Sequence, residues 1–478
     1  MTEKQQGKAA LSAKDEKFRE FALNDNMWKV VLYVGTPLAL YQSLNQLFKI
    51  FDSMMAAHIG ASSVSAVAYL SQISLMLSAI GGGLAIGSSL KISQAYGAGD
   101  FELVKKRVST LFAMCAVLGF GILTILVPFA PVFLKFARTP EVFIAEGTLY
   151  FRLELFGMVI SFFNNVYIAI ERARGNSGRI LRLNMAVIAV KLSLTALFVY
   201  VLGSGISMIS VATIISQSVL LTAAIHNMNN KGNAFGFSLH AISLKRATTL
   251  PMITLSIPVI IEKMAFSFGK VIINSMSTIY SALTVGAMGI SNNIGGITTQ
   301  PQNGFQEGGS AIISQSMGAG KPRRALKAFF CILVINMSLG ALLMSTSLFF
   351  LDEITGLFAG NDTAFQEMIQ NIYRYEAMGA IPLGINSAVM ALLYGFGKTK
   401  LTLTINFCRV FVFRVPVLWY LQNFTSQGSN SVGIVMAVSN ISTGVLAFFI
   451  GAWQIHQICK KYHIAPFASV TGGTIQKA

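Results

Sequence analysis

The sequence has few charged residues for its length. Of its 478 residues, 12% are charged and 54% are hydrophobic, whereas a soluble globular domain carries about 25% charged residues. The apolar residues fall in long blocks, and the mean hydropathy is +0.62. A soluble core of this size would need amphipathic helices and more charge. The composition therefore indicates an all-α polytopic membrane protein.

Sequence motifs of several enzyme classes are also missing. There is no phosphate-cradling GxxxxGK[ST] segment, so we do not expect ATP as the energy source. There is no HExxH, and the five histidines lie in loops or near the ends of apolar segments. The four cysteines show neither disulfide nor metal spacing. We therefore expect no enzyme activity, no metal and no resident cofactor. The polar first 27 residues predict no cleavable signal peptide.

Twelve segments are long and apolar enough to cross about 30 Å of hydrocarbon. Their expected bounds are 30–57, 66–90, 108–133, 148–171, 183–203, 206–228, 251–280, 284–313, 328–351, 372–395, 401–421 and 431–457. The eighth is the least hydrophobic, because "SNNIGGITTQPQNGFQEGG" is nearly a polar loop. The chain also contains an internal repeat, and the position of this segment in the repeat supports the prediction that it spans the membrane.

Lysine and arginine gather in the two tails and in the loops on one side of the spans. These loops include "LVKKRVS", "RARGNSGRILR" and "GKPRRALK", whereas the opposite loops contain Lys135 and Arg138. By the positive-inside rule, both termini are expected in the cytoplasm, with the chain in a plasma membrane such as a bacterial inner membrane. The net charge of +17 follows this bias and predicts no nucleic-acid partner, since the sequence offers no soluble basic face.

The chain contains a duplication. The segment 37–99 aligns with 258–320 at one constant offset, so that "ISQAYGAG" pairs with "ISQSMGAG", and "YFRLELFG" later pairs with "IYRYEAMG". The repeat unit is six spans, an even number, so both halves insert in the same orientation. We expect two six-helix lobes related by a pseudo-two-fold axis along the membrane normal, an arrangement typical of transporters. The predicted parts are a tail (1–27), a first lobe (28–228), a linker (229–250), a second lobe (251–457) and a tail (458–478).

The first and seventh spans each carry a polar stripe at helical spacing. The stripe residues that we expect in a substrate cavity are Gln42, Asn45, Gln46, Lys49, Lys263, Lys270 and Asn274, joined by Gln302 of the eighth span. The acids at depth are Asp52 and Glu262, and Lys191 lies in the middle of the fifth span. Ionisable groups inside a membrane usually face a bundle interior or water. The alternatives are a neutralised structural pair, such as Lys49 with Asp52, or a lysine extending to the membrane surface. Arg409 and Arg414 are interpreted as packing against helix ends and carbonyl groups.

The sequence resembles the multidrug and toxic compound extrusion (MATE) family over about residues 28–457. The resemblance rests on the six-plus-six repeat, "FDSMMAAHIGASSVSAVA", "SQAYGAGD" with its echo "SQSMGAGK", "RARGN" and "PVIIEKMAFSFG". It implies a V-shaped central cavity and export of organic solutes against inward movement of H⁺ or Na⁺. It also implies that Asp52 binds or exchanges the coupling ion.

The sequence departs from the family pattern near this acid. The family's asparagine in the fifth span falls on Lys191 and its aspartate on Thr195, while its threonine in the sixth span is matched by Thr213. An ammonium group there would repel Na⁺, which favours H⁺. Glu262 matches an acid that follows the proline of the seventh span in some branches, and is expected to serve in the second lobe. The lysine stripes favour an anionic or zwitterionic substrate.

The sequence therefore predicts a cation-coupled antiporter, acting as a monomer in the lipid bilayer on a small organic substrate. One alternative is a lipid-linked oligosaccharide flippase of the same superfamily, which would also need cationic cavity residues. Another is a membrane receptor or scaffold that transports nothing. The coupling ion, H⁺ or Na⁺, is the one ligand expected besides the substrate.

Overall fold

The computed structural model describes residues 10–57, 61–136, 141–205, 207–230, 232–360 and 362–464. The side chains at 50, 52–57, 61–72, 75, 136, 141–147 and 282 lie outside this description. Within the described chain every regular element is a helix, and one isolated bridge pairs Ala10 with Asn233. The expectation of an all-α protein is therefore confirmed.

The helices of the first half begin with a short helix before the long ones. They are α1 (Ala13–Asn24), α2 (Met27–Ala57), α3 (Ala61–Ala98), α4 (Phe101–Leu126), α5 (Ala130–Phe136), α6 (Glu141–Ala173), α7 (Ser177–Ala196), the π-helix η1 (Leu197–Val201) and α8 (Ser207–Met228). A connection containing the 3-10 helix η2 (Leu239–Ala241) leads to the second half. We call α2–α8 the N-terminal bundle.

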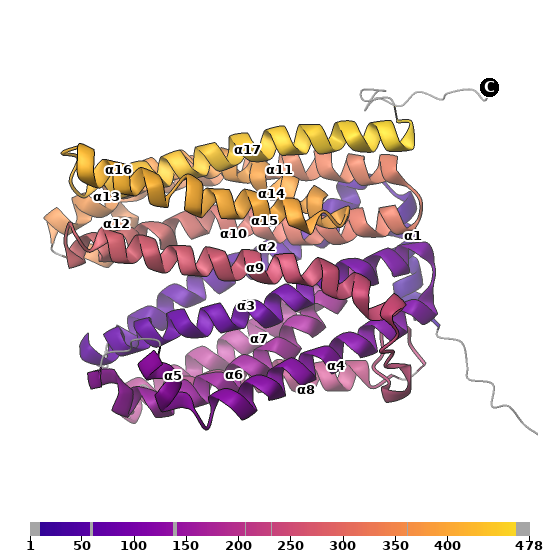
Figure 1. Ribbon diagram of the computed structural model, residues 1–478, viewed down its shortest axis with the longest axis horizontal. Helices are drawn as coiled ribbons and strands as arrows, with labels where there is room; N and C mark the ends of the chain where they lie inside the picture. Colours follow the sequence, from indigo (N-terminus) through magenta and orange to yellow (C-terminus); the bar gives the residue numbers. More distant parts are fainter. Residues whose placement is uncertain are drawn as a thin grey trace, which may run out of the picture.

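The second half repeats this order with more breaks. Its helices are α9 (Arg246–Ser277), α10 (Ala282–Gly318), α11 (Pro322–Phe349), α12 (Leu351–Ala359), α13 (Thr363–Ala377), α14 (Ala380–Gly395), α15 (Thr399–Phe407), the π-helix η3 (Cys408–Val412), α16 (Val415–Phe424) and α17 (Asn430–Tyr462). We call α9–α17 the C-terminal bundle. Figure 1 shows α3–α8 on one side of the molecule and most of the C-terminal bundle on the other.

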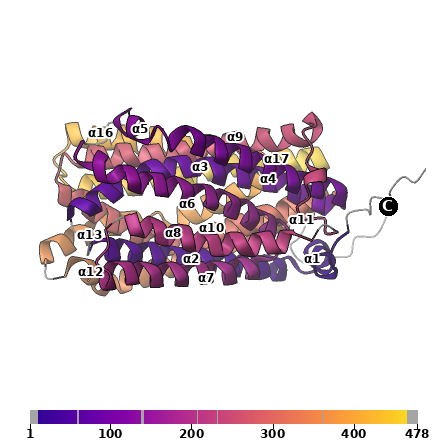
Figure 2. The same cartoon turned by 90° about the horizontal axis from the view of Figure 1, so that it is seen from below.

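Helix packing follows the sequence repeat. In the N-terminal bundle α3 packs on α6, α6 on α8 and α2 on α7; in the C-terminal bundle α10 packs on α14, α14 on α17 and α9 on α15. Between the bundles, α2 lies along α10 and α3 along α9 (Figure 2). In the sequence repeat α2 corresponds to α9, and α3 corresponds to α10. Exchanging the two halves therefore turns the α2–α10 crossing into the α9–α3 crossing, as a pseudo-two-fold relation requires.

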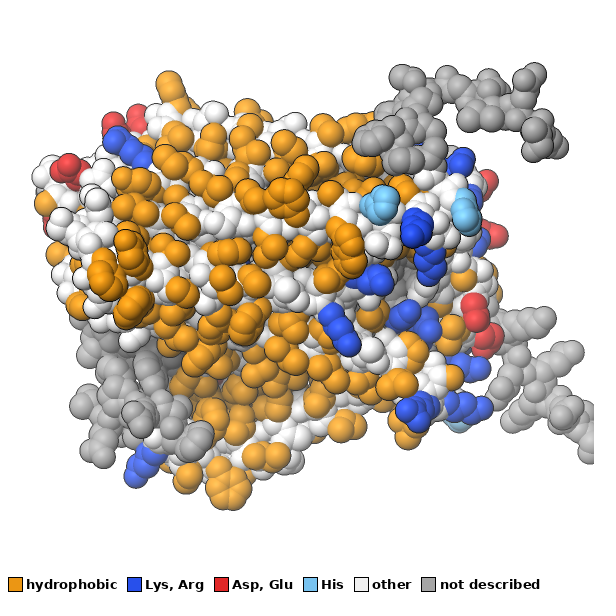
Figure 3. All heavy atoms as spheres, turned by 45° about the horizontal axis from the view of Figure 1, so that its top comes forward, with side chains coloured by type: hydrophobic (Ala, Val, Ile, Leu, Met, Phe, Trp, Pro, Cys, Tyr) orange, Lys and Arg blue, Asp and Glu red, His pale blue; other side chains and the backbone are white. Residues whose placement is uncertain are grey.

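The described residues include nine helices that are long and apolar enough to cross a membrane, or ten if the pair α13 and α14, bent by 48°, forms one span. Helix α10 forms as a continuous helix but is not among them, because its polar residues lower its hydropathy. Figure 3 shows a broad apolar belt around the middle, with lysine and arginine gathered at the end where α17 finishes.

Paired glycines let the two bundles approach closely. A Cβ atom added at Gly83 of α3 would lie 2.7 Å from the Cα atom of Ile260 in α9, and one added at its repeat partner Gly304 would meet the backbone of Ala39 in α2. A contact of that length is too short for any side chain. The repeated glycines therefore mark the places where each crossing brings two backbones together.

Both bundles are also joined at the end where α1 and Tyr462 lie, which we call the terminal face. Helix α1 lies there, held by Arg19, whose guanidinium group donates to the carbonyl oxygens of Tyr96 and Gly97 at 3.0 and 2.9 Å. On the other side Arg324 of α11 donates to the carbonyl oxygens of Ala22 and Asp25 at 2.9 and 2.7 Å. Helix α1 is thus bonded to α3 through its own arginine and to α11 through its final residues.

Candidate functional site

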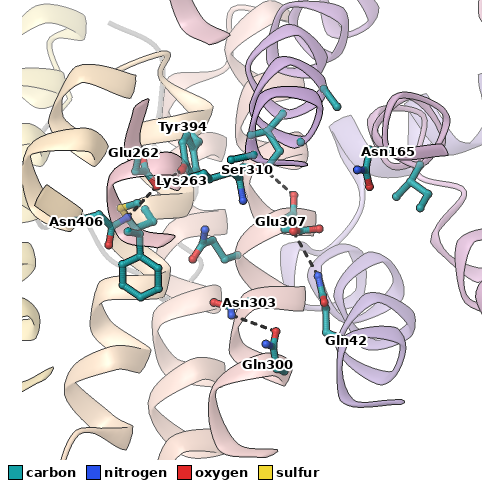
Figure 4. Close-up of a pocket in the computed structure, with 18 of the residues that line it drawn as sticks. Gln42, Asn165, Glu262, Lys263, Gln300, Asn303, Glu307, Ser310, Tyr394 and Asn406 are labelled. Atoms are coloured by element: carbon teal, nitrogen blue, oxygen red, sulfur yellow. Dashed lines mark hydrogen bonds between the residues drawn. The ribbon is translucent and has the colours of Figure 1, made fainter. Parts of the chain in front are cut away.

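A cavity of about 590 Å³ lies between the two bundles, and we call it the central cavity. Its charged lining residues are Lys49, Arg172, Glu262, Lys263, Glu307 and Arg409. Figure 4 shows Glu262, Tyr394 and Asn406 close together on one wall, with Gln42 and Asn165 on helices of the other bundle. The cavity is therefore polar, charged and built by residues from both halves of the repeat.

Glu262 of α9 is buried in this wall at 6% exposure and makes three side-chain hydrogen bonds. Its Oε1 atom accepts from the Tyr394 hydroxyl and from the Asn406 amide, each at 2.8 Å. Its Oε2 atom lies 2.6 Å from the hydroxyl of Thr402, and that hydroxyl also lies 2.9 Å from the carbonyl oxygen of Thr399. Because Thr402 has one hydrogen and two acceptors, it can donate to a carboxylate or, turned to Thr399, accept from a protonated carboxyl group.

Two charged residues in the lining of the central cavity bond the bundles to each other. Arg172 of α6 forms an ion pair with Glu307 of α10, and the side-chain amide of Gln42 donates to the same carboxylate at 3.3 Å. Closer to the terminal face, Gln315 donates to the carbonyl oxygen of Ala173 at 2.6 Å. These contacts hold α10 against α6 and α2.

A second cavity of about 380 Å³, which we call the side chamber, lies in the C-terminal bundle against α2. Its charged lining residues are Lys49, Lys270, Glu376, Arg409 and Arg414. It shares six lining residues with the central cavity: Lys49, Phe266, Gln300, Asn303, Asn386 and Arg409. The two spaces therefore adjoin, with these six residues at their boundary.

The predicted substrate residues divide between these cavities. Gln42 and Lys263 line the central cavity, Lys49 lines both, and Gln46, Lys270 and Gln302 line the side chamber. Gln302 also bridges the backbone, donating to the carbonyl oxygens of Asn336 and Ala380 at 3.0 Å each. Asn45 and Asn274 are not among the lining residues of either cavity.

The residues predicted for ion coupling lie in different places. Asp52 belongs to α2, but its side chain lies outside the described residues. The Lys191 ammonium group lies 4.8 Å from the centroid of the Phe48 ring, one helical turn before Asp52. The Thr213 hydroxyl donates to the carbonyl oxygen of Ile209 in its own helix at 3.0 Å and lines neither cavity. Among the described residues no cluster of histidine, cysteine and acidic side chains is arranged to hold a metal ion.

Several charged residues that line the cavities do not follow from the sequence pattern. Glu307 and Glu376 were not recognised as acids at depth, and Arg172 was assigned to a loop. Arg409 and Arg414 were interpreted as packing residues, whereas both line the side chamber. One signal was available for Glu376, because the repeat aligns it with Glu154 inside a span.

Comparison with known proteins gives one family. The family model described as MatE matches residues 37–201 and 258–420, once in each half of the chain. The probable multidrug resistance protein YoeA of Bacillus subtilis (strain 168) is 21% identical over 414 residues, covering 84% of this chain and 88% of that protein. Protein DETOXIFICATION 38 of Arabidopsis thaliana is 22% identical over 421 residues, covering 84% and 80%.

The fold also matches solved structures. The crystal structure of MATE in complex with MaL6 superposes with a TM-score of 0.88 at 18% identity, covering 93% of this chain and 99% of that chain. A MOP superfamily transporter from Pyrococcus furiosus, described as having a binding pocket of reverse polarity, superposes with a TM-score of 0.87 at 18% identity, covering 94% and 99%.

Proposed function

The chain belongs to the MatE family, whose members are membrane transporters rather than enzymes, and on this premise we propose that it is a proton-coupled antiporter that exports organic solutes through the central cavity. The observation that carries the proposal is the polar cavity of about 590 Å³ lined by charged residues from both halves of the repeat. A space of this size suits a small organic molecule. Relatives named as multidrug resistance proteins support export as the direction.

The proposed architecture is twelve spans in two lobes, 28–228 and 251–457, related by an axis along the membrane normal. The matching helix contacts in the two bundles support this arrangement. Helices α2 and α10 are the two spans that bring the ten candidate spans to twelve. Their polar faces meet each other and the cavities rather than lipid. The cluster of lysine and arginine at the terminal face supports a cytoplasmic location for both termini.

We propose that the structure represents the conformation closed to the cytoplasm. The pair between Arg172 and Glu307 in the cavity lining, the bond from Gln315 to Ala173 and the contacts of α1 at the terminal face all join the two bundles on this side of the molecule and support the proposal. Alternating access requires that these contacts break in the opposite state. Solute would then enter from the cytoplasm and leave after they form again.

Glu262 is the proposed proton site of the C-terminal bundle. The Thr402 hydroxyl allows the buried side chain to be satisfied in both charge states, as a carrier of exchangeable protons needs. Asp52 is the proposed partner site in the N-terminal bundle. Lys191 lies beside α2, and its positive charge disfavours Na⁺ binding there by direct repulsion.

The proposed substrates are anionic or zwitterionic organic molecules. Lys49, Lys263 and Arg409 line the central cavity, and Lys270 and Arg414 line the adjoining side chamber. A cationic drug would meet these groups with like-charge repulsion. The solved transporter with a pocket of reverse polarity supports the view that binding pockets in this fold differ in the sign of their charge.

Reconstitution in liposomes tests the proposal. A pH gradient and a Na⁺ gradient are imposed separately, and anionic and cationic solutes are screened with the wild type, Glu262→Gln and Asp52→Asn. We expect the pH gradient to drive solute movement in the wild type and not in Glu262→Gln. Movement that responds to neither gradient would contradict antiport, and movement driven by Na⁺ alone would contradict proton coupling.

A further inference from the structure

The side chamber has an excess of positive charge. Lys270 of α9, Arg409 of η3 and Arg414 line it, and Glu376 of α13 is the one acid among its described lining residues. None of the ion pairs between described residues includes any of these three cations. Charged groups at this depth in a membrane protein are costly. Four cations, counting Lys49 at the boundary with the central cavity, beside one acid therefore require an explanation beyond a structural pair.

The two arginines leave one buried donor without a hydrogen-bond partner. Arg409 donates to Oδ1 of Asn440 at 2.8 Å, and Arg414 donates to the same oxygen at 3.3 Å and to the Ser439 hydroxyl at 3.1 Å. The Nε atom of Arg409 is buried without a hydrogen-bond partner. Two guanidinium groups thus share one neutral amide oxygen. Guanidinium groups bind phosphate and carboxylate oxygens in pairs, and such an oxygen would accept from the unpartnered Nε atom of Arg409.

A break in the helix brings the two arginines together. In a regular α-helix, residues five positions apart point in directions about 140° apart. Here the chain passes through the π-helix Cys408–Val412 and a turn before α16 begins at Val415. As a result both guanidinium groups reach Asn440. Single π-helical turns are frequent at functional sites. The repeat places Val187 and Leu192 at the corresponding positions of the N-terminal bundle, so the arrangement belongs to one bundle only.

The Lys270 ammonium group lies close to the same arginine. Its Nζ atom is 5.1 Å from the centroid of the Phe266 ring, and the Cζ atom of Arg409 is 5.3 Å from that centroid. Phe266 lines both cavities. The cationic groups are therefore positioned beside the boundary, where part of a molecule in the central cavity could reach them.

We infer that the side chamber is a binding site for a doubly charged oxyanion group, either a phosphate monoester or a pair of carboxylates, with Arg409, Arg414 and Lys270 as its ligands. With Lys49, which lies at the boundary with the central cavity, four cations and one acid line the chamber, so a dianionic group meets a net positive charge. The rest of the molecule lies in the central cavity. The inference rests on the proposed function in one respect, that the bound anion is the transported solute.

In this arrangement Glu376 lowers the affinity of the side chamber for anions. Its Oε2 atom accepts a hydrogen bond from the Ser291 hydroxyl, which holds its carboxylate in the chamber lining. A negative charge there repels an incoming anion. Replacing Glu376 by glutamine should therefore strengthen anion binding, whereas a purely structural role for Glu376 in balancing the arginines predicts no gain in binding.

The experiment is calorimetric titration of the purified full-length protein, without any gradient. Four probes share an aromatic ring and differ in charge: phenyl phosphate, phthalate, benzoate and benzyltrimethylammonium. We expect phenyl phosphate or phthalate to bind at least about tenfold more tightly than benzoate, since each charge-assisted bond to a guanidinium group contributes strongly. Tighter binding of phenyl phosphate assigns a phosphate ligand, and tighter binding of phthalate a dicarboxylate. Preferential binding of benzyltrimethylammonium would overturn the inference.

Variants separate a site from a structural effect. Arg409→Gln should weaken binding of the preferred anion about tenfold, Arg409→Lys should recover part of it, and Glu376→Gln should tighten it several-fold. Arg374→Gln, which removes an exposed arginine from the same bundle outside the chamber, is the matched control and should change nothing. A misfolded variant cannot produce tighter binding, so unchanged or weaker binding by Glu376→Gln contradicts the inference.

Anion binding without coupled transport would overturn the proposed antiport alone, and coupled transport without anion binding would overturn this inference alone.

Discussion

Arg172 and Glu307 form an ion pair that joins the two bundles beneath the central cavity. The two residues come from different halves of the chain, and Gln42 donates to the same carboxylate. Glu307 is partly accessible, at 24% side-chain exposure, and Arg172 is nearly buried, at 7%. The pair therefore lines the space that a solute would occupy and is part of the proposed closure toward the terminal face.

Glu307→Gln should shift the protein toward the conformation open at the terminal face. Losing a hydrogen bond between charged groups should cost the closed state about 1.5–3 kcal/mol. Spin labels at positions 106 and 398, both exposed at the terminal face, would report the separation of the bundles in a background without native cysteines. We expect a population with longer distances. Glu353→Gln, which changes an exposed acid on α12, should leave the distances as in the wild type.

Glu262→Gln should uncouple transport from protons. Glutamine keeps the size of the side chain and can still bond to Tyr394 and Asn406, but it carries no exchangeable acidic proton. We expect transport driven by a pH gradient to fall to background, while exchange of labelled for unlabelled solute continues. Loss of both activities would contradict a coupling role and indicate that Glu262 binds the solute or maintains the fold.

Gly83→Ala should lower the thermal stability of the protein, because a Cβ atom there would lie 2.6 Å from the Cγ1 atom of Ile260 and 2.7 Å from its Cα atom. Overpacking of this kind costs about 1–3 kcal/mol. Gly82→Ala is the matched control, since a Cβ atom at Gly82 meets nothing within 4 Å. Melting temperatures that coincide for the two variants would show that the α3–α9 crossing relaxes without cost.

Arg324→Gln should release helix α1 from the C-terminal bundle. The guanidinium group bonds the carbonyl oxygens of Ala22 and Asp25, and losing these bonds should speed hydrogen exchange in Ala13–Asn24 about tenfold. The neighbouring Arg323 is exposed, and Arg323→Gln should exchange like the wild type. Equal rates in both variants would mean that the other bonds of α1, to α3 and to Lys321 of the C-terminal bundle, hold it without Arg324.

The sequence predicted the helical architecture well because its signals are local or repetitive. Long apolar blocks mark the spans, and the repeated glycines Gly83 and Gly304 meet the opposite bundle in equivalent ways. The polar eighth segment was predicted as a span from the repeat, and it forms the continuous helix α10. Its polar residues meet α2 and the cavities. A hydropathy average does not show which partner a polar residue contacts.

The candidate site was predicted less completely because it depends on contacts between distant helices. Helical spacing identified the face that carries Lys49 and Lys270, and both residues line cavities. The same spacing gave no reason to bring Arg409 and Arg414 together, since a regular helix would separate them. Only the π-helix Cys408–Val412 does so, and neither its position nor the partner Asn440 follows from local pattern.

The most direct test of the account is the proton movement that accompanies solute export. Liposomes containing the protein and a trapped pH dye are loaded with phenyl phosphate or with benzyltrimethylammonium, and the membrane potential is clamped with K⁺ and valinomycin. On dilution, outward movement of a transported solute should draw protons inward and acidify the interior in the wild type, and not in Glu262→Gln. Solute leaving through the wild-type protein with no change of internal pH would contradict proton-coupled antiport.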